Sequence, residues 1–184
     1  MNKFAEWVNK PQTIAGACGL LFAVLFIVGG PVMQGETPTL SDNASEVRAY
    51  WEEDHGRYVA GDLFITVGIL FGLVPFAVAT ARALRPHDPS GGVWSGLMLA
   101  GVFVAVFLGG AGALFLNGVA LFGAENVDDS TLLFATRAAI FSVNGVALGF
   151  GLMLVAAAAV MVQSKAFGRW LGFAALVAAV PCLV

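Results

Sequence analysis

Residues 61–85, GDLFITVGILFGLVPFAVATARALR, decide the fold of this chain. The segment is apolar except for Asp62 near one end and Arg82 and Arg85 at the other. A helix rises 1.5 Å per residue, so about 20 apolar residues match the ~30 Å hydrocarbon layer of a bilayer. We therefore predict a membrane-spanning helix. Pro75 should bend it, because proline lacks the N–H that pairs with the carbonyl four residues earlier.

Similar apolar segments lie on both sides of this one. The 184-residue chain is 59% hydrophobic and 11% charged, whereas soluble domains contain about 25% charged residues. We predict an all-α integral membrane helical bundle, a single transmembrane domain with four full spans and a fifth that is short or truncated. The spans are expected at about residues 13–33, 61–85, 93–122, 131–163 and 169–184. Gly123 should end the third span, and Asp129 or Ser130 should cap the fourth.

The fifth apolar run is shorter than the roughly 17 residues that a span needs. No polar flank follows it before the sequence stops at Val184. We therefore expect that the chain is truncated within this segment.

Charges between the spans alternate in sign along the chain. Six basic residues fall in the N-terminus and in every second connection: Lys3, Lys10, Arg82, Arg85, Lys165 and Arg169. Most acidic residues fall in or beside the other connections, residues 34–60 and 124–130. Short loops rich in lysine and arginine stay in the cytoplasm. We predict a cell inner (plasma) membrane protein with a cytoplasmic N-terminus and with residues 34–60 and 124–130 extracytoplasmic.

Residues 43–59 predict an amphipathic helix on the outer surface. Asn43 and Glu46 have the spacing of a capping box, in which each side chain accepts a backbone N–H of the other. Four apolar or aromatic residues recur near helical spacing: Val47, Tyr50, Trp51 and Tyr58. We expect the aromatic rings at the level of the lipid headgroups, where an apolar ring with a polar edge is best accommodated.

Glycine is abundant, with 23 residues, and several glycines lie four residues apart. Gly68 and Gly72 form one such pair, and Gly145 and Gly149 form another. Helices in lipid associate by close backbone approach, which small residues permit. These faces either pack inside the bundle or, together with Trp51 on the outer helix, form an interface with another membrane protein.

Polar side chains inside the spans are the candidate ligand or ion-pair residues, because they are costly in lipid unless paired or used. Asp62 and Arg137 are expected near the same outer surface, where they can form an ion pair. Asn117 and Asn144 lie deeper, and each can join two helices or contact a ligand. Hydroxyl groups in the spans can be satisfied by their own helix backbones: Thr66, Thr80, Thr136 and Ser142.

The sequence contains no recognised catalytic motif. Walker A, GxSxG and HExxH patterns are all missing. Glu52 and His55 form half of a di-iron carboxylate motif, which needs a second such pair and two further glutamates. We therefore predict no enzyme activity, no metal and no cofactor, although a bound lipid is compatible with the bundle. The chain lacks the basic footprint of a nucleic-acid-binding protein.

Two segments carry a resemblance to a known class of proteins. SEVRAYWEEDHGRYVAGDLF, residues 45–64, precedes a span, and AFGRWLGFAAL, residues 166–176, follows a short basic loop. In this layout the chain resembles a broad group of uncharacterised bacterial multi-pass membrane proteins of the actinobacterial type, a domain-of-unknown-function class. The resemblance implies a membrane location and one further span. It implies no mechanism and no catalytic residues.

Three functions are compatible with these observations. The first is a non-enzymatic accessory or structural subunit that associates with other membrane subunits, or with itself, through glycine-rich faces. The alternative is a small-molecule binder or transporter with a site among the outer halves of spans two to four. It predicts that Asp62, Arg137, Asn117 and Asn144 converge on a cavity. The third is an intramembrane enzyme that uses the outer acidic residues.

Overall fold

The computed structural model describes residues 11–164 and 168–183, and its regular elements in those ranges are all helical. In chain order they are α2 (Pro11–Ile27), η1 (Val28–Gln34), α3 (Ala44–Gly68), η2 (Ile69–Leu73), α4 (Val74–Leu84), η3 (Arg85–His87), α5 (Val93–Phe122), η4 (Ala124–Asn126), α6 (Asp129–Gln163) and α7 (Arg169–Leu183). Here η1 and η2 are π-helical turns, and η3 and η4 are 3-10 turns. Three of the basic residues used to predict the orientation in the membrane lie outside the described residues: Lys3, Lys10 and Lys165.

Four helical stretches are long and apolar enough to cross a membrane. They are Thr13–Gln34, Ala44–His87, Val93–Phe122 and Asp129–Gln163. The shorter apolar helix α7 follows them. The predicted all-α bundle of four spans and a short fifth helix is therefore confirmed.

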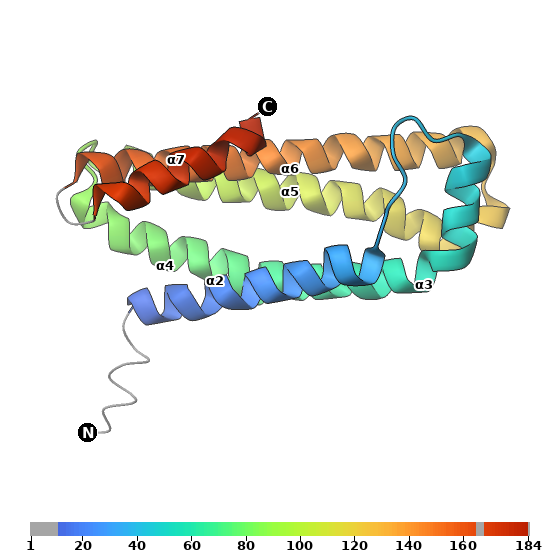
Figure 1. Ribbon diagram of the computed structural model, residues 1–184, viewed down its shortest axis with the longest axis horizontal. Helices are drawn as coiled ribbons and strands as arrows, with labels where there is room; N and C mark the ends of the chain where they lie inside the picture. Colours follow the sequence, from blue (N-terminus) through green and yellow to red (C-terminus); the bar gives the residue numbers. More distant parts are fainter. Residues whose placement is uncertain (1–10, 165–167, 184) are drawn as a thin grey trace, which may run out of the picture.

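The outer helix and the second span are continuous, in contrast to the two separate helices predicted from the sequence. Asn43 caps α3 and forms the expected capping box with Glu46. The helical run then continues to His87 through η2, the π-helical turn that precedes Pro75. Figure 1 shows that α3 bends, so that its first part crosses the end of the bundle. The first part of α3, which is the amphipathic segment, thus covers the ends of α5 and α6. The second part of α3 runs along the bundle.

The helices form two layers that run side by side (Figure 1). In one layer α2 packs on α3, η2 and α4, and in the other α6 packs between α5 and α7. Two clusters of buried side chains join the layers. One lies between α4, α5 and α6 around Leu84, Met98 and Val160, and the other lies between α3, α5 and α6 around Trp51 and Leu132. The first cluster extends from the end where α4 and α5 are joined, and the second lies toward the bent end of α3.

The aromatic face of the outer helix belongs to the second cluster. Trp51 and Tyr58 are buried, and the Trp51 ring makes edge contacts with Tyr50 and Tyr58 at centroid distances of 5.1 and 4.9 Å. The aromatic side chains therefore share one face of the helix, as the sequence predicted. Its rings pack against the ends of α5 and α6, because the bend in α3 lays this face on the protein. Their position at the level of the lipid headgroups stays a prediction.

The connection between α5 and α6 is set by its two end residues. Gly123 ends α5 with a positive φ of 80°, as expected for a glycine after a helix. Asp128, rather than the predicted Asp129 or Ser130, caps α6, and its carboxylate accepts the Thr131 N–H at 3.0 Å. The sequence DDST offers several capping residues in a row, so pattern alone placed the cap a residue or two too late.

The Asp128 cap predicts a pH effect. Hydrogen bonds from the Ser130 hydroxyl and from Thr131 hold the pKa of the Asp128 carboxyl below its ordinary value. Because the folded pKa is the lower one, this contribution to stability is present above about pH 4 and is lost as the pH falls below it. Asparagine also caps helices but does not titrate. We expect Asp128→Asn to lose less thermal stability than the wild type between pH 5 and pH 3. Equal losses in the two proteins would contradict this role.

Candidate ligand site between the helix layers

An inner cavity of about 330 Å³ lies between the two layers. Its walls come from α2, η1, α3 and η2 on one side and from α5 and α6 on the other. Both π-helical turns contribute, through Gly30 and Pro31 of η1 and Ile69 and Leu73 of η2. Such turns shift the phase of a helix by one residue and are frequent at functional sites. The lining is mostly apolar, as in sites that bind small lipophilic molecules.

A second, outer pocket of about 650 Å³ adjoins the cavity toward the bent end of α3. It lies between the connecting loop at residues 37–41, the outer part of α3, and α6. The pocket and the cavity share four lining residues: Gln34, Tyr58, Leu116 and Val143. The two spaces are therefore neighbours that share a wall.

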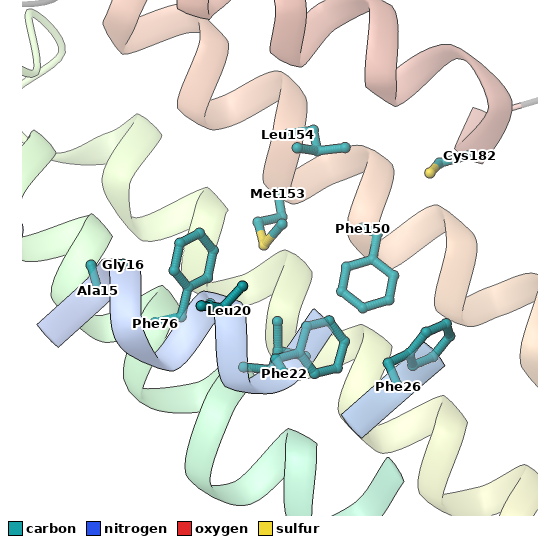
Figure 2. Close-up of a pocket in the computed structure, with 12 residues that line it drawn as sticks. Ala15, Gly16, Leu20, Phe22, Phe26, Phe76, Phe150, Met153, Leu154 and Cys182 are labelled. Carbon is teal, nitrogen blue, oxygen red and sulfur yellow. The ribbon is translucent and has the colours of Figure 1, made fainter. Parts of the chain in front are cut away.

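A lateral groove of about 630 Å³ adjoins the cavity on its other side. Its lining residues come from α2, η2, α4, α6 and the end of α7, and they are apolar. Figure 2 shows Phe22 and Phe26 on α2 opposite Phe150 and Met153 on α6. The Phe22 and Phe150 ring centroids are 6.2 Å apart, and both rings also line the inner cavity. This aromatic pair is thus the boundary between the groove and the cavity.

The polar end of the inner cavity is formed by Asp62. This residue lies one turn after Tyr58 on α3, and its carboxylate accepts the Asn117 Nδ2–H at 2.8 Å. The bond joins the two layers, because Asn117 belongs to α5. Asn117 Oδ1 is buried and has no partner. Asp62 thus pairs with Asn117, and not with the predicted Arg137, and both residues of the pair are half-buried.

Two residues that line the outer pocket each carry a polar atom that is buried and lacks a partner. Trp51 and Thr136 both line it and are 2% and 3% exposed. Trp51 Nε1 and Thr136 Oγ1 are buried with no hydrogen-bond partner. A buried polar group without a partner costs about 1–3 kcal/mol. Sequence reasoning missed these atoms: Ser142 donates to its own helix at Ala138 as expected, but Thr136 does not.

Arg137 does not join the other candidate residues. It is exposed and lies beside Phe134 and Phe141, on a different face of α6 from Thr136. Within the described residues the ion pairs are Arg48–Asp129 and Arg57–Asp54, so the suggested Asp62–Arg137 pair does not form. Neighbouring positions on a helix point about 100° apart. Because Thr136 faces the pocket, Arg137 must face elsewhere.

Asn144 lines the outer pocket on the same face of α6 as Thr136, two turns further along the helix. Of the four candidate ligand residues, Asp62 therefore lines the cavity, Asn144 lines the pocket and Asn117 holds Asp62. The four residues therefore do not converge on one cavity: Asp62 and Asn144 line two neighbouring spaces, Asn117 lines neither of them, and Arg137 lies apart.

The glycine faces lie inside the bundle. A Cβ on Gly72 would lie 2.7 Å from the backbone nitrogen of Phe22, and Gly68 faces Leu25. Gly149 faces Ala105 of α5 in the same way. Gly145 approaches the side chain of Leu108, and Trp51 is buried in the outer cluster. The faces considered for a partner are thus occupied by neighbouring helices of the same chain.

The long apolar helices and their exposed apolar side chains define an integral, multi-pass membrane protein. No known protein family matches the chain, and neither the curated proteins nor the solved structures contain a detectable relative. The part of the chain that the structure describes contains no group of three or more metal-binding side chains.

Proposed function

We propose that this protein binds a small lipophilic molecule between its two helix layers. The observation that carries the proposal is the inner cavity, which lies between an apolar groove and an outer pocket with some polar lining residues and shares walls with both. A molecule dissolved in the bilayer reaches the cavity from the groove when Phe22 and Phe150 part. Its apolar body fills the cavity, and Asp62 and Asn117 mark the polar end.

The charges at the two ends of the bundle support one orientation in the membrane. Arg82, Arg85 and Arg169 lie at one end of the helices, and the acidic segments 34–60 and 124–130 lie at the other. Loops rich in lysine and arginine remain cytoplasmic. We therefore place the outer pocket on the extracytoplasmic side. The absence of enzyme activity also stays a prediction under this binding function.

The geometry favours this function over an accessory subunit. The subunit hypothesis rested on glycine faces and on Trp51, and all of these contact other helices of the same chain. An association with other membrane proteins stays a prediction, but the residues predicted to form its surface are occupied by helices of the same chain. The binding proposal has a defined space with defined walls.

A cavity-filling substitution tests the proposal. Ala113 lines the cavity and is half-buried, so Ala113→Leu extends a side chain from the cavity wall. The probe is a hexadecanol carrying a photoreactive diazirine in mid-chain. We expect saturable labelling of cavity residues in the wild type. A single misfit methylene group in an apolar pocket changes binding by about tenfold or more, so Ala113→Leu should lose at least that much.

Gly118→Leu is the matched control. It lies on the same helix but lines neither the cavity nor the outer pocket, an added Cβ there meets nothing within 4 Å, and its neighbours Leu114 and Leu121 are 78% and 76% exposed. Labelling of this variant should equal that of the wild type. Unsaturable labelling spread over the lipid-facing helices, or equal labelling of both variants, would reject a binding function for the cavity.

A further inference from the structure

The carboxylate of Asp62 allows the class of ligand to be narrowed, an inference that rests on the proposed function. Leu63 and Phe64, which follow it on α3, are exposed apolar side chains, so Asp62 lies at the beginning of the apolar part of this helix. A carboxylate in a membrane-spanning segment is costly unless a partner compensates its charge. The partners of Asp62 therefore decide what the cavity can bind.

One oxygen of Asp62 is engaged and the other is open. Oδ2 accepts the Nδ2–H of Asn117, an uncharged donor, at 2.8 Å. Oδ1 accepts no hydrogen bond from the described residues, and it is not closed off by neighbouring atoms as Asn117 Oδ1 is. Asp62 lines the inner cavity. A bound molecule can therefore donate a hydrogen bond to this carboxylate.

Within the described residues, no basic side chain compensates the charge of Asp62. The ion pairs there are Arg48–Asp129 and Arg57–Asp54. The described residues that line the cavity include no lysine, arginine or histidine, and Asp62 is the charged residue among them. Those that line the adjoining outer pocket are all uncharged. A bound cation supplies the missing counter-charge, whereas an anionic group would be repelled and would lack a counter-ion.

The aromatic lining favours a cation for an independent reason. Phe22, Phe26, Tyr58 and Phe150 line the cavity, and Tyr58 lies one turn before Asp62 on α3. The face of an aromatic ring is electrically negative, so it attracts a cation while it also packs against apolar groups. The cavity thus suits a molecule that combines an apolar body with a positive charge.

We infer that the ligand is a lipophilic amine, bound in the inner cavity as its ammonium ion with Asp62 as the counter-ion. An aliphatic amine keeps its proton at neutral pH, because the pKa of such a group is about 10. The ammonium donates a hydrogen bond to Asp62 Oδ1, while Asn117 holds the carboxylate through Oδ2. A phosphate beside the amine would meet Asp62 without a basic residue to compensate it, so phospholipid headgroups do not fit this class.

Three probes with one chain separate the charge of the ligand from its apolar body. They are the diazirine hexadecanol described above, the hexadecylamine with the same diazirine, and the corresponding hexadecanoic acid. Each is titrated into the purified protein in a non-ionic detergent, and labelled peptides are quantified by mass spectrometry after illumination. We expect the amine to reach half-maximal labelling of cavity residues at a concentration at least tenfold lower than the alcohol, and the acid to label least.

Asp62→Asn removes the charge but keeps an oxygen that can accept from Asn117. Glu53→Gln is the matched control, because it also removes one carboxylate from α3, but Glu53 is exposed and does not line the cavity. A hydrogen bond to a charged group changes affinity by about tenfold to a hundredfold. We expect Asp62→Asn to lose that much affinity for the amine and to keep its affinity for the alcohol. Glu53→Gln should bind both probes as the wild type does.

The comparison of the three probes in the wild type tests the charge assignment independently of any variant. Equal affinities for the amine and the alcohol, or tighter binding of the acid, would overturn it. An equal loss of amine affinity in Asp62→Asn and Glu53→Gln would also overturn it. In each case the alcohol would still label the cavity and Ala113→Leu would still lose that labelling, so failure of the charge assignment is distinct from failure of the binding function.

Discussion

Gly149→Ala should prevent normal packing of α5 on α6. A Cβ at residue 149 would lie 2.6 Å from the backbone nitrogen of Ala105 and 2.7 Å from the carbonyl oxygen of Gly101. Both are backbone atoms of a facing helix, so relief requires α5 to move as a whole. Overpacking of a tight interface costs about 1–3 kcal/mol, or more where no side chain can yield. We expect the upper end of that range, measured as a large fall in melting temperature in detergent.

Gly145→Ala is the matched substitution, one helical turn earlier on the same face. Its Cβ would meet the end of the Leu108 side chain, which can rotate away. Alanine also favours a helix over glycine by about 1 kcal/mol. We therefore expect little change or a small rise in melting temperature. Equal destabilisation by the two alanines would show that α5 and α6 do not approach in this way.

Arg48→Met should detach the outer helix from the loop between α5 and α6. The Arg48 guanidinium donates to the carbonyl oxygens of Ala124 and Val127 and forms an ion pair with Asp129 at 2.6 Å. Methionine keeps the apolar stem but leaves these acceptors without the donor. Hydrogen bonds to a charged group each contribute about 1.5–3 kcal/mol, so we expect a loss of roughly 2–3 kcal/mol. Thermal unfolding in detergent measures it.

Arg57→Met provides the control on the same helix. Arg57 pairs with Asp54 at 3.1 Å, but its side chain is 62% exposed. An exposed pair of this kind contributes less than about 1 kcal/mol. Trp51 lines the outer pocket one turn after Arg48, so Arg48→Met should also reduce labelling by the diazirine hexadecanol, whereas Arg57→Met should not. Similar effects of both substitutions would contradict the role of Arg48 in holding the outer helix on the loop between α5 and α6.

The architecture could be predicted because the bilayer imposes it. A span must be apolar over a fixed length, so residues 93–122 and 131–163 were recognisable without any alignment. The capping box at Asn43 and Glu46 depends on local hydrogen bonds and was equally readable. The continuity of α3 through Gly61 was not, because the polar-to-apolar change at this point looks the same for one bent helix as for two helices.

The candidate site was only partly predictable, because an apolar helix does not reveal which face looks inward. In water, polar residues mark the outside of a helix, but in lipid both faces are apolar. The sequence therefore identified Asp62 and Asn117 as polar groups in the spans without showing how Arg137 was oriented. Thr136 was missed for the same reason. Its lack of a partner depends on the packing of α6 against α3 and not on any local pattern.

The position of the two buried clusters has a mechanical consequence. Leu84 and Met98 fasten the layers toward one end, and Trp51 and Leu132 fasten them toward the other. Between these fastenings an unfilled space forfeits the dispersion contacts that its walls would otherwise make. A molecule that fills the inner cavity restores such contacts, so under the proposed function the ligand joins the two layers between their fastened ends and slows their separation.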